Sequence, residues 1–329
     1  MKEEEIRKKE TFDRYLSLVK KDVKHYFKDT ASFEKIRCPA CSSTSLTNEF
    51  EKVGFTYQQC KQCYTLFVNP RPTHEQLIDF YASSPSTTFW INDFFKPVEK
   101  IRTTKIFQPR AEWVVNYFGK SMKKWTIGDI GAGFGIFLQE LKNYWRDNKY
   151  IAIEPSREQC EICEMKGLDF ICKAVEDIDN MGSTFDLLTA FELFEHLQNP
   201  GRFLDTVYHL LKPGGYFLFT TLNGNGFDIQ ILWDKSKSVF PPHHLNFFNP
   251  NSIGLLIKNH HFKVIDIATP GKLDWNIVEN MINKDHVSVE RFWNYIANSH
   301  DEKMKDDLQT WIRTHNLSSH MRVLCSKPK

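Results

Sequence analysis

The sequence lacks long hydrophobic runs and a strong excess of either charge. No segment of its 329 residues approaches about 18 consecutive apolar residues, so we expect no membrane-spanning helix. The charged first residues, Met1–Glu5, lack the apolar centre of a secretion signal, and a cytoplasmic location is therefore expected. The formal net charge of +2 at pH 7 offers no global field that would attract nucleic acid or an anionic membrane.

The eight cysteines are unevenly distributed along the chain. Four of them form two Cys-x-x-Cys pairs, Cys38 with Cys41 and Cys60 with Cys63. In a chain without a secretion signal, such pairs indicate a bound metal before they indicate disulfides. Two knuckles of this kind place four thiolates around one Zn²⁺ and leave no open coordination position. The sequence therefore predicts a structural zinc in a small N-terminal ribbon.

A cluster of glycines follows the apolar segment Thr126–Ile130 and precedes an apolar pattern at helical spacing. Gly131, Gly133 and Gly135 permit positive φ and let a ligand approach the backbone, while free N–H groups of the next helix point toward it. The pattern predicts a strand, a tight turn and a helix. A nucleotide-like ligand is one interpretation of this turn, and a plain strand-to-helix connection is the other.

From Trp125 onward, strands and helices alternate regularly. We expect strands at 126–130, 150–154, 169–173, 185–191, 216–221 and 262–267, with helices at 135–145, 156–166 and 202–211 between them. This alternation predicts an α/β fold with a doubly wound parallel sheet. In such sheets an acid about twenty residues after the glycines holds ribose hydroxyls. Glu154 ends the second strand, 23 positions beyond Gly131, and therefore favours the nucleotide-like ligand.

The chain divides by pattern into five predicted parts. Residues 83–88 are predicted to form a loop, because they are rich in serine, threonine and proline. Packing explains the aromatic residues that follow, and a ligand-facing role for Trp90 or Arg102 is the alternative. The predicted parts are N-terminal helices at 1–35, a zinc ribbon at 36–70, a helical connector at 71–120, an α/β core at 121–271, and a helical insertion with a closing strand at 272–329.

An ordered series of motifs resembles the class I S-adenosylmethionine-dependent methyltransferases, closest to the branch with the ubiquinone-biosynthesis O-methyltransferases. The series consists of Asp129-Ile-Gly-Ala-Gly-Phe-Gly135, Glu154, Phe185–Leu197 and Leu211-Lys-Pro-Gly-Gly215. The resemblance covers about 120–270 and implies a Rossmann-like, mostly parallel sheet of seven strands. A dehydrogenase is disfavoured, since its nucleotide-binding pattern is normally GxGxxG.

The resemblance also implies which residues contact the cofactor. Asp129, Gly131, Ala132, Gly133 and Gly135 would surround its methionine part, and Glu154 would hold the ribose. Val175 and Glu176 would border the adenine, and Phe191 is assigned to the cofactor as well. The family often has an acid where this chain has Ala174, so Glu176 is the candidate substitute.

Methyl transfer requires an acceptor atom held in line with the sulfonium methyl group, and a hydroxyl acceptor must also lose a proton. Histidine is the usual base near neutral pH. His243 and His244 are one pair of candidates, with anchoring of a loop as the alternative. The second place is Glu192, Glu195 and His196, where the resemblance implies a divalent metal and Mg²⁺ is the candidate; the alternative is that His196 only caps a helix and packs.

The sequence thus predicts a methyltransferase that acts on a small-molecule or sugar-like acceptor, by O-methylation with a histidine base before C- or N-methylation. Two alternatives stay open: an rRNA-base methyltransferase whose ribbon grips RNA, and a scaffold that binds S-adenosylmethionine without catalysis. The near-neutral charge and the weakly basic segment Tyr57–Gln62 count against RNA. The identity of the acceptor and the formation of a homodimer are left open by the sequence.

Overall fold

The computed structural model describes residues 2–329 and contains a seven-stranded sheet and a four-stranded sheet. The larger sheet has the order β10-β11-β8-β7-β4-β5-β6, with β11 antiparallel to both of its neighbours and β4 to β8 parallel. The prediction of a mostly parallel seven-stranded α/β sheet is therefore confirmed. Its strands are β4 (Thr126–Ile130), β5 (Lys149–Ile153), β6 (Asp169–Ile171), β7 (Phe185–Phe191), β8 (Leu211–Leu222), β10 (Lys263–Ala268) and β11 (His320–Ser326).

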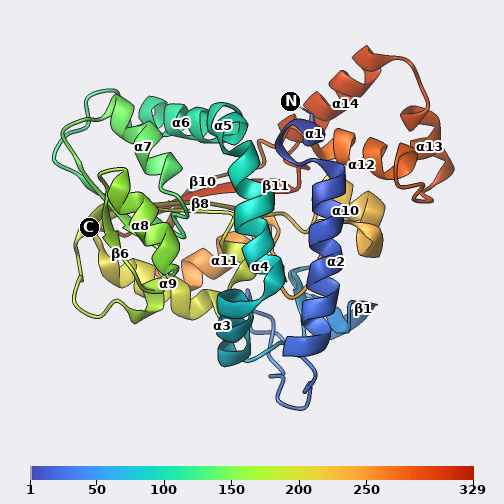
Figure 1. Ribbon diagram of the computed structural model, residues 1–329, viewed down its shortest axis with the longest axis horizontal. Helices are drawn as coiled ribbons and strands as arrows, with labels where there is room; N and C mark the ends of the chain where they lie inside the picture. Colours follow the sequence, from blue (N-terminus) through green and yellow to red (C-terminus); the bar gives the residue numbers. More distant parts are fainter. Residues whose placement is uncertain (1) are drawn as a thin grey trace.

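Helices cover both faces of this sheet (Figure 1). Because successive side chains of a strand point to opposite faces, Leu187 packs into one apolar cluster and Leu188 into another. Burial on both faces explains why the parallel strands are continuously apolar. The first cluster includes α6 (Gln108–Phe118) and α7 (Ile136–Tyr144), and the second includes α9 (Pro200–Leu210) and α11 (Pro250–Asn259). Between β5 and β6 lies α8 (Arg157–Met165).

The four-stranded sheet joins the cysteine ribbon to a distant part of the chain. Its order is β1 (Leu46–Lys52), β2 (Phe55–Cys60), β3 (Leu66–Val68) and β9 (Asn246–Phe247), and all neighbours are antiparallel. Leu66 pairs with Phe247, so the last strand of the ribbon sheet comes from the segment that directly follows His243 and His244.

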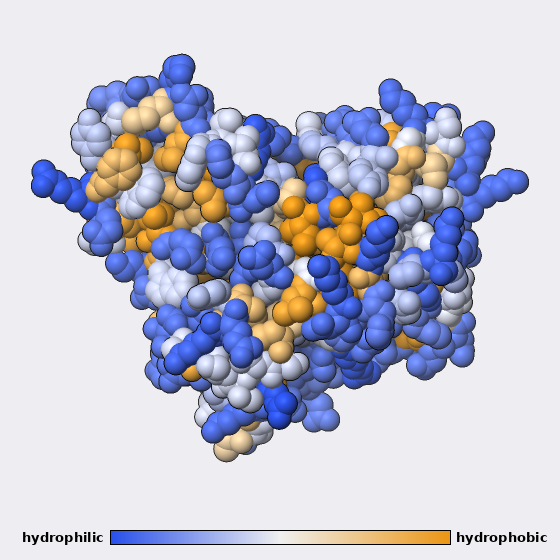
Figure 2. Space-filling view, turned by 180° about the vertical axis from the view of Figure 1, so that it is seen from behind, coloured by the Kyte–Doolittle hydropathy of each residue, from blue (hydrophilic) through white to orange (hydrophobic). Residues whose placement is uncertain are grey.

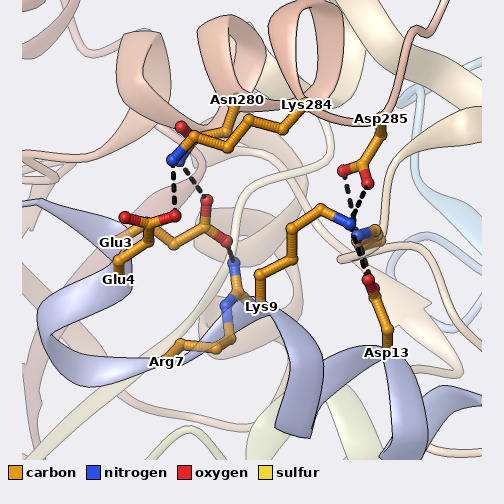
Figure 3. Close-up of polar contacts among 9 residues, drawn as sticks. Glu3, Glu4, Arg7, Lys9, Asp13, Asn280, Lys284 and Asp285 are labelled. Carbon is orange, nitrogen blue, oxygen red and sulfur yellow. Dashed lines mark hydrogen bonds and ion pairs between the residues drawn. The ribbon is translucent and has the colours of Figure 1, made fainter.

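The N-terminal segment contains α1 (Glu3–Ile6) and α2 (Lys9–Tyr26), and α2 buries its apolar stripe beside α4 (Pro85–Phe89; Figure 1). Polar contacts tie the segment to α12 (Asp274–Asn283) and the residues after it, as Figure 3 shows. Asn280 donates to Glu3 at 3.0 Å, and Lys9 pairs with Asp285 at 2.7 Å. These contacts thus join the N-terminal segment to a part of the chain that is more than 270 residues away in sequence.

The connector differs from the prediction at two places. The predicted loop at 83–88 contains α4 (Pro85–Phe89), because Ser84 caps its N-terminus by accepting from the N–H of Thr87 at 3.3 Å, and Pro85 takes the first helical position. The helical connector predicted at 71–120 also contains two π-helical segments, at Trp90–Phe95 and Thr103–Phe107. The connector elements are α3 (His74–Ser83), α4, η1 (Trp90–Phe95), η2 (Lys96–Val98), α5 (Glu99–Arg102), η3 (Thr103–Phe107) and α6.

The predicted helical insertion before the last strand forms its own apolar cluster with α10 (Phe227–Leu232). Trp275, Val278 and Ile312 are buried there. The insertion consists of α12, α13 (Arg291–Ala297) and α14 (Glu302–Thr314), which Figure 1 shows as a lobe beside the sheet. Figure 2 shows a notch between two lobes and a group of apolar side chains below it. Across residues 2–329, we find no helix with the length and apolar character needed to cross a membrane.

Candidate functional site

The predicted glycine turn lies between β4 and α7. Gly131, Gly133 and Gly135 have φ of 69°, 54° and 67°, a region that favours glycine. Gly135 also has no room for a side chain, since a Cβ there would lie 2.5 Å from Cδ1 of Leu168 and 3.0 Å from Sγ of Cys163. The turn therefore needs glycine for its conformation and, at Gly135, for close packing.

Two buried acids lie at the carboxyl ends of the neighbouring strands β4 and β5. Glu154 follows β5, and its carboxylate accepts from the N–H groups of Gly133 and Ser156, both at 3.0 Å. Asp129 accepts from the hydroxyl of Thr189 at 2.6 Å. Burial raises the pKa of Asp129 to about 7 and also raises the pKa of Glu154. Both carboxyl groups are fixed by donors, and each keeps lone pairs for a ligand hydroxyl or amine.

The other residues predicted for the cofactor lie at the same edge of the sheet. Val175 is buried and Glu176 partly buried in a single 3-10 turn after β6. Phe191 ends β7, where its ring packs on Phe137 with centroids 4.6 Å apart and below the guanidinium of Arg110 at 4.7 Å. With the adjoining Ala132, these residues surround the carboxyl ends of β4 to β7, the usual position of a nucleotide in such sheets.

Glu192 directly follows β7 and has a φ of 53°, which is uncommon for a residue other than glycine. Its carboxylate lies 2.9 Å from the guanidinium of Arg110 and 3.3 Å from Nδ1 of His320, and it accepts from the hydroxyl of Thr220 at 2.6 Å. Burial alone would raise the pKa of Glu192, but the charges of His320 and Arg110 outweigh it and lower the pKa to about 2. Glu192 is therefore ionised at neutral pH.

A second polar cluster contains Glu195, His196 and His244, whose side-chain ligand atoms all lie within 4.8 Å of one another. Glu195 is buried and accepts from the hydroxyl of Thr221 at 2.9 Å, and Nδ1 of His196 lies 3.4 Å from the hydroxyl of Tyr81. Carboxylate and imidazole donors together can hold a divalent cation. Glu192 lies outside this cluster, because it is turned toward Arg110, so the three predicted magnesium ligands are not brought together.

The adjacent residues His243 and His244 have different surroundings. His243 lies among the rings of Tyr15, Phe80 and Tyr81, with centroids 5.7, 5.1 and 5.5 Å away. Its Nε2 is buried and has no hydrogen-bond partner within residues 2–329, and burial lowers its pKa to about 3. The Nδ1 atom of His244 instead lies at the carbonyl oxygen of Ser238. Of the two histidines, only His244 belongs to the cluster with Glu195 and His196.

The four predicted zinc ligands come together in the ribbon. The Sγ atoms of Cys38 and Cys63 are 3.4 Å apart, those of Cys41 and Cys60 are 3.5 Å apart, and all four lie within 4.8 Å of one another. Four sulfurs bonded tetrahedrally to one Zn²⁺ would be separated by about 3.8 Å, given zinc–sulfur bonds of about 2.3 Å. The arrangement therefore fits a closed, four-thiolate zinc site.

The ribbon contacts the histidine cluster directly. Tyr57 in β2 donates its hydroxyl to the carbonyl oxygen of His244 at 2.7 Å. The fully buried Arg71 donates to the carbonyl of Gln198 at 2.7 Å and to the side-chain oxygen of Asn246 at 3.0 Å. The position of His244 thus depends on side chains that the cysteine ribbon supports.

No sequence motif marks three polar residues with unusual surroundings: Arg110, His320 and Asp228. Arg110 and His320 contact Glu192 from segments far along the chain. Asp228 in α10 is fully buried, and neither of its carboxyl oxygens has a hydrogen-bond partner within the described residues. No local motif marks these positions, and only the Gly224–Gly226 bend before α10 could have directed attention to Asp228.

Comparisons with known proteins agree with this architecture. Residues 107–267 match a family model described as a methyltransferase domain. Among curated relatives, the ubiquinone biosynthesis O-methyltransferase of Chromobacterium violaceum is 28% identical over 145 residues, which are 42% of this chain and 59% of the relative. That of Pectobacterium atrosepticum is 25% identical over 166 residues, 47% of this chain and 64% of the relative. The chain thus spans less than two thirds of these relatives.

One solved structure supports the fold alone. A chain from the complex of the Haloferax volcanii Trm112 methyltransferase activator with a methyltransferase aligns with a TM-score of 0.50 at 14% identity, over 73% of this chain and 96% of that one. The fold and the glycine turn are those of class I, Rossmann-like methyltransferases. Residues 107–267, just under half of the chain, thus match the methyltransferase domain model, and the motifs of this region are similar to those of the ubiquinone-biosynthesis O-methyltransferases.

Proposed function

We propose that the chain is an S-adenosylmethionine-dependent methyltransferase that O-methylates a small-molecule or sugar-like acceptor with a histidine base. The observation that carries this proposal is the carboxylate of Glu154, held at 3.0 Å by the N–H groups of Gly133 and Ser156 beside the left-handed glycine turn. A carboxylate in this position accepts hydrogen bonds from ribose hydroxyls, and the glycines leave the backbone open to the rest of the cofactor.

The cofactor contacts follow from the positions of the predicted residues. Glu154 would bind the ribose, and Val175 with Glu176 would border the adenine. Asp129 and residues 131–135 would hold the methionine part. S-adenosylmethionine, when bound, supplies a methyl group carried on a sulfonium sulfur.

His244 is the proposed base. Its Nδ1 lies at the carbonyl oxygen of Ser238, so this nitrogen carries the proton and Nε2 keeps its lone pair. Nε2 would take the hydroxyl proton of the acceptor while the oxygen–carbon bond forms and the bond between the methyl carbon and the sulfonium sulfur breaks; the proton would then leave to solvent. His196 is the second candidate, and His243 is less suitable because aromatic rings surround it. The alternative use of Glu195, His196 and His244 is to hold a divalent cation; two imidazoles favour a transition metal over Mg²⁺.

The ribbon is proposed to hold one structural Zn²⁺ through Cys38, Cys41, Cys60 and Cys63. Four thiolates would fill the coordination shell of the ion and leave no position for a water or a substrate, so the ion would have no direct part in catalysis. Its role would be to keep β2 and β3 folded against β9 and the histidine segment.

Calorimetry with S-adenosylhomocysteine tests the cofactor site. Glu154→Ala is expected to weaken binding at least about tenfold, because the ribose loses a charged acceptor in a buried site. Glu164→Gln, an exposed change on α8, is the matched control and should leave the affinity unchanged. Absence of binding to the unmodified chain would contradict the proposed function.

Methyl transfer to a panel of sugars and hydroxylated aromatics then tests the acceptor class. Retention on RNA with a steep salt dependence would favour the RNA alternative.

A further inference from the structure

Arg102, the last residue of α5, has a partly buried side chain without a counterion. Its Nε is buried and has no hydrogen-bond partner within residues 2–329, and none of the acids described there lies within ion-pair distance. The neighbouring arginines differ in this respect. Arg7 pairs with Glu3, and Arg110 pairs with Glu192 at 2.9 Å.

This difference leaves one surplus positive charge in the region. The charges of Arg7, Arg110 and Glu192 all act on Arg102. Arg7 and Arg110 each have an acid partner of their own. Burial lowers the pKa of Arg102 to about 10, so the guanidinium is still protonated at neutral pH. A partly buried cation without an acid partner is poorly compensated, and a ligand that carries the opposite charge would stabilise it.

Glu192, whose charge acts on Arg102, lies beyond ion-pair distance of it. Its Oε1 atom is contacted by Arg110 at 2.9 Å, by the hydroxyl of Thr220 at 2.6 Å and by His320 at 3.3 Å. The Glu192 side chain nevertheless keeps 36% of its surface exposed. The carboxylate therefore borders a space that a ligand or solvent can enter, beside the unpaired arginine.

The position of Arg102 also points to the ligand site. Its guanidinium lies 5.0 Å from the ring centroid of Phe95, and this ring packs at 5.3 Å against Phe134, which lies between Gly133 and Gly135. Arg102 is thus connected through one ring to the glycine turn. The π-helical segments Trp90–Phe95 and Thr103–Phe107 lie close before and directly after α5, and such segments occur frequently at functional sites.

We propose that Arg102 binds an oxyanion, a carboxylate or a phosphate, of a ligand that enters this site. A guanidinium fork can pair with either group through two parallel hydrogen bonds. Two sources have this chemistry: the carboxylate at the amino-acid end of S-adenosylmethionine, and an acidic group of the acceptor. This inference rests on the proposed function, because Arg102 has a role only if the glycine turn binds the cofactor and methyl transfer takes place beside it.

The first experiment compares two nucleosides by calorimetry. S-adenosylhomocysteine carries the amino-acid carboxylate, and 5′-methylthioadenosine lacks it. If the cofactor is the source, Arg102→Gln weakens binding of S-adenosylhomocysteine about tenfold or more and leaves the affinity for 5′-methylthioadenosine unchanged. Arg102→Lys keeps the charge and should recover part of the loss. Arg146→Gln changes an exposed arginine two residues after α7; it is the matched control and should have no effect.

The second experiment uses inorganic phosphate and acetate as probes, at constant ionic strength and with S-adenosylhomocysteine present. If the acceptor is the source, either anion raises the Tm of the unmodified chain, and Arg102→Gln abolishes that rise while it binds S-adenosylhomocysteine normally. The proposal is overturned if Arg102→Gln and the unmodified chain behave alike in both experiments. Failure of the unmodified chain to bind S-adenosylhomocysteine would instead overturn the proposed function, and the anion measurement without nucleoside would still test Arg102.

Discussion

The two sides of the candidate site are built from very different lengths of chain. The glycine side consists of Asp129, the turn at 131–135 and Glu154, and all its residues come from two neighbouring strands and their ends. The histidine side consists of Glu195, His196, His243 and His244. Its supporting side chains come from α2, the ribbon and α3, through Tyr15, Tyr57 and Tyr81.

This difference indicates how each side can fail. The glycine side is held by the main sheet, so it depends on local backbone geometry and on the packing of α7. The histidine side is held by contacts between segments that are distant in sequence, and β9 belongs to the ribbon sheet. Disturbing the ribbon should therefore affect the histidine side and spare the glycine side, and each prediction below tests that separation.

The largest effect is expected from removing two of the cysteines that we propose as zinc ligands in the ribbon. Cys60→Ser combined with Cys63→Ser should abolish zinc binding, because a structural zinc supplies much of the folding free energy of so small a unit, on the order of 10 kcal/mol. Residues 240–248 should then exchange amide hydrogens faster, while residues 126–135 keep their protection. Metal analysis and hydrogen exchange measure both effects, and Cys172→Ser, outside the cluster, is the control. Equal loss of protection on both sides would show that they unfold as one unit.

Next in size is the effect of exchanging the histidines. His244→Gln should lower kcat about 10²- to 10⁴-fold with the acceptor that the panel identifies, because it removes the proposed base. His243→Gln should change kcat much less and should act on stability, since His243 packs among aromatic rings. The calorimetric affinity for S-adenosylhomocysteine should be the same for both variants. If His243→Gln lowered kcat more than His244→Gln, the assignment of the base would be wrong.

On the glycine side, alanine substitutions at Gly135 and Gly167 distinguish the cost of backbone strain from the cost of a steric clash. Gly135→Ala places a Cβ 2.5 Å from Leu168 at a φ of 67°, and should lower the free energy of unfolding by about 2–4 kcal/mol. Gly167→Ala has a φ of 68° with no atom within 4 Å, and should cost only about 1–2 kcal/mol. Denaturant unfolding measures both values. Equal losses would mean that Leu168 and Cys163 move aside without cost.

The same contrast explains how much the sequence could predict. Cys38, Cys41, Cys60 and Cys63 have a spacing that predicts one shared ion, and they come together in the ribbon. The glycines and Glu154 follow a rule of short-range spacing in parallel sheets, and they meet as expected. The seven-stranded sheet was predictable for a similar reason, because its strands and helices alternate in order.

The remaining contacts could not be predicted, because they depend on tertiary packing. Arg110 and Glu192 are 82 residues apart, and nothing near either position indicates that they form a pair. Glu192 pairs with Arg110 and lies outside the cluster that contains Glu195 and His196, so the expected set of three metal ligands is divided. The short helix α4 was a different kind of miss, since Ser84 followed by Pro85 is a local capping signal.

The smallest effect concerns two neighbouring acids in the helical lobe. Asp274 accepts from the hydroxyl of Ser318 at 2.8 Å and from the N–H of Ser319 at 2.7 Å. Neither carboxyl oxygen of Asp228 has a hydrogen bond of ordinary geometry within residues 2–329. Burial, followed by the charge of Asp274, raises the pKa of Asp228 to about 7, although the Ser319 side chain acts in the opposite direction. Arg7 is the positive group that acts on Asp228.

The raised pKa sets the sign of a pH effect on stability. Between the unfolded pKa of about 4 and the folded value of about 7, the folded state binds the extra proton, so stability falls as the pH rises through this window. Asp228→Asn removes the ionisable group, and should raise the free energy of unfolding at pH 8 by about 1–3 kcal/mol and leave it nearly unchanged at pH 4. Asp274→Asn should destabilise at pH 8, because its donors lose a charged acceptor. Denaturant unfolding at both pH values measures these changes. If Asp228→Asn lost stability at pH 8, the surroundings of Asp228 would stabilise its carboxylate, and the proposed cost of this buried acid would be wrong.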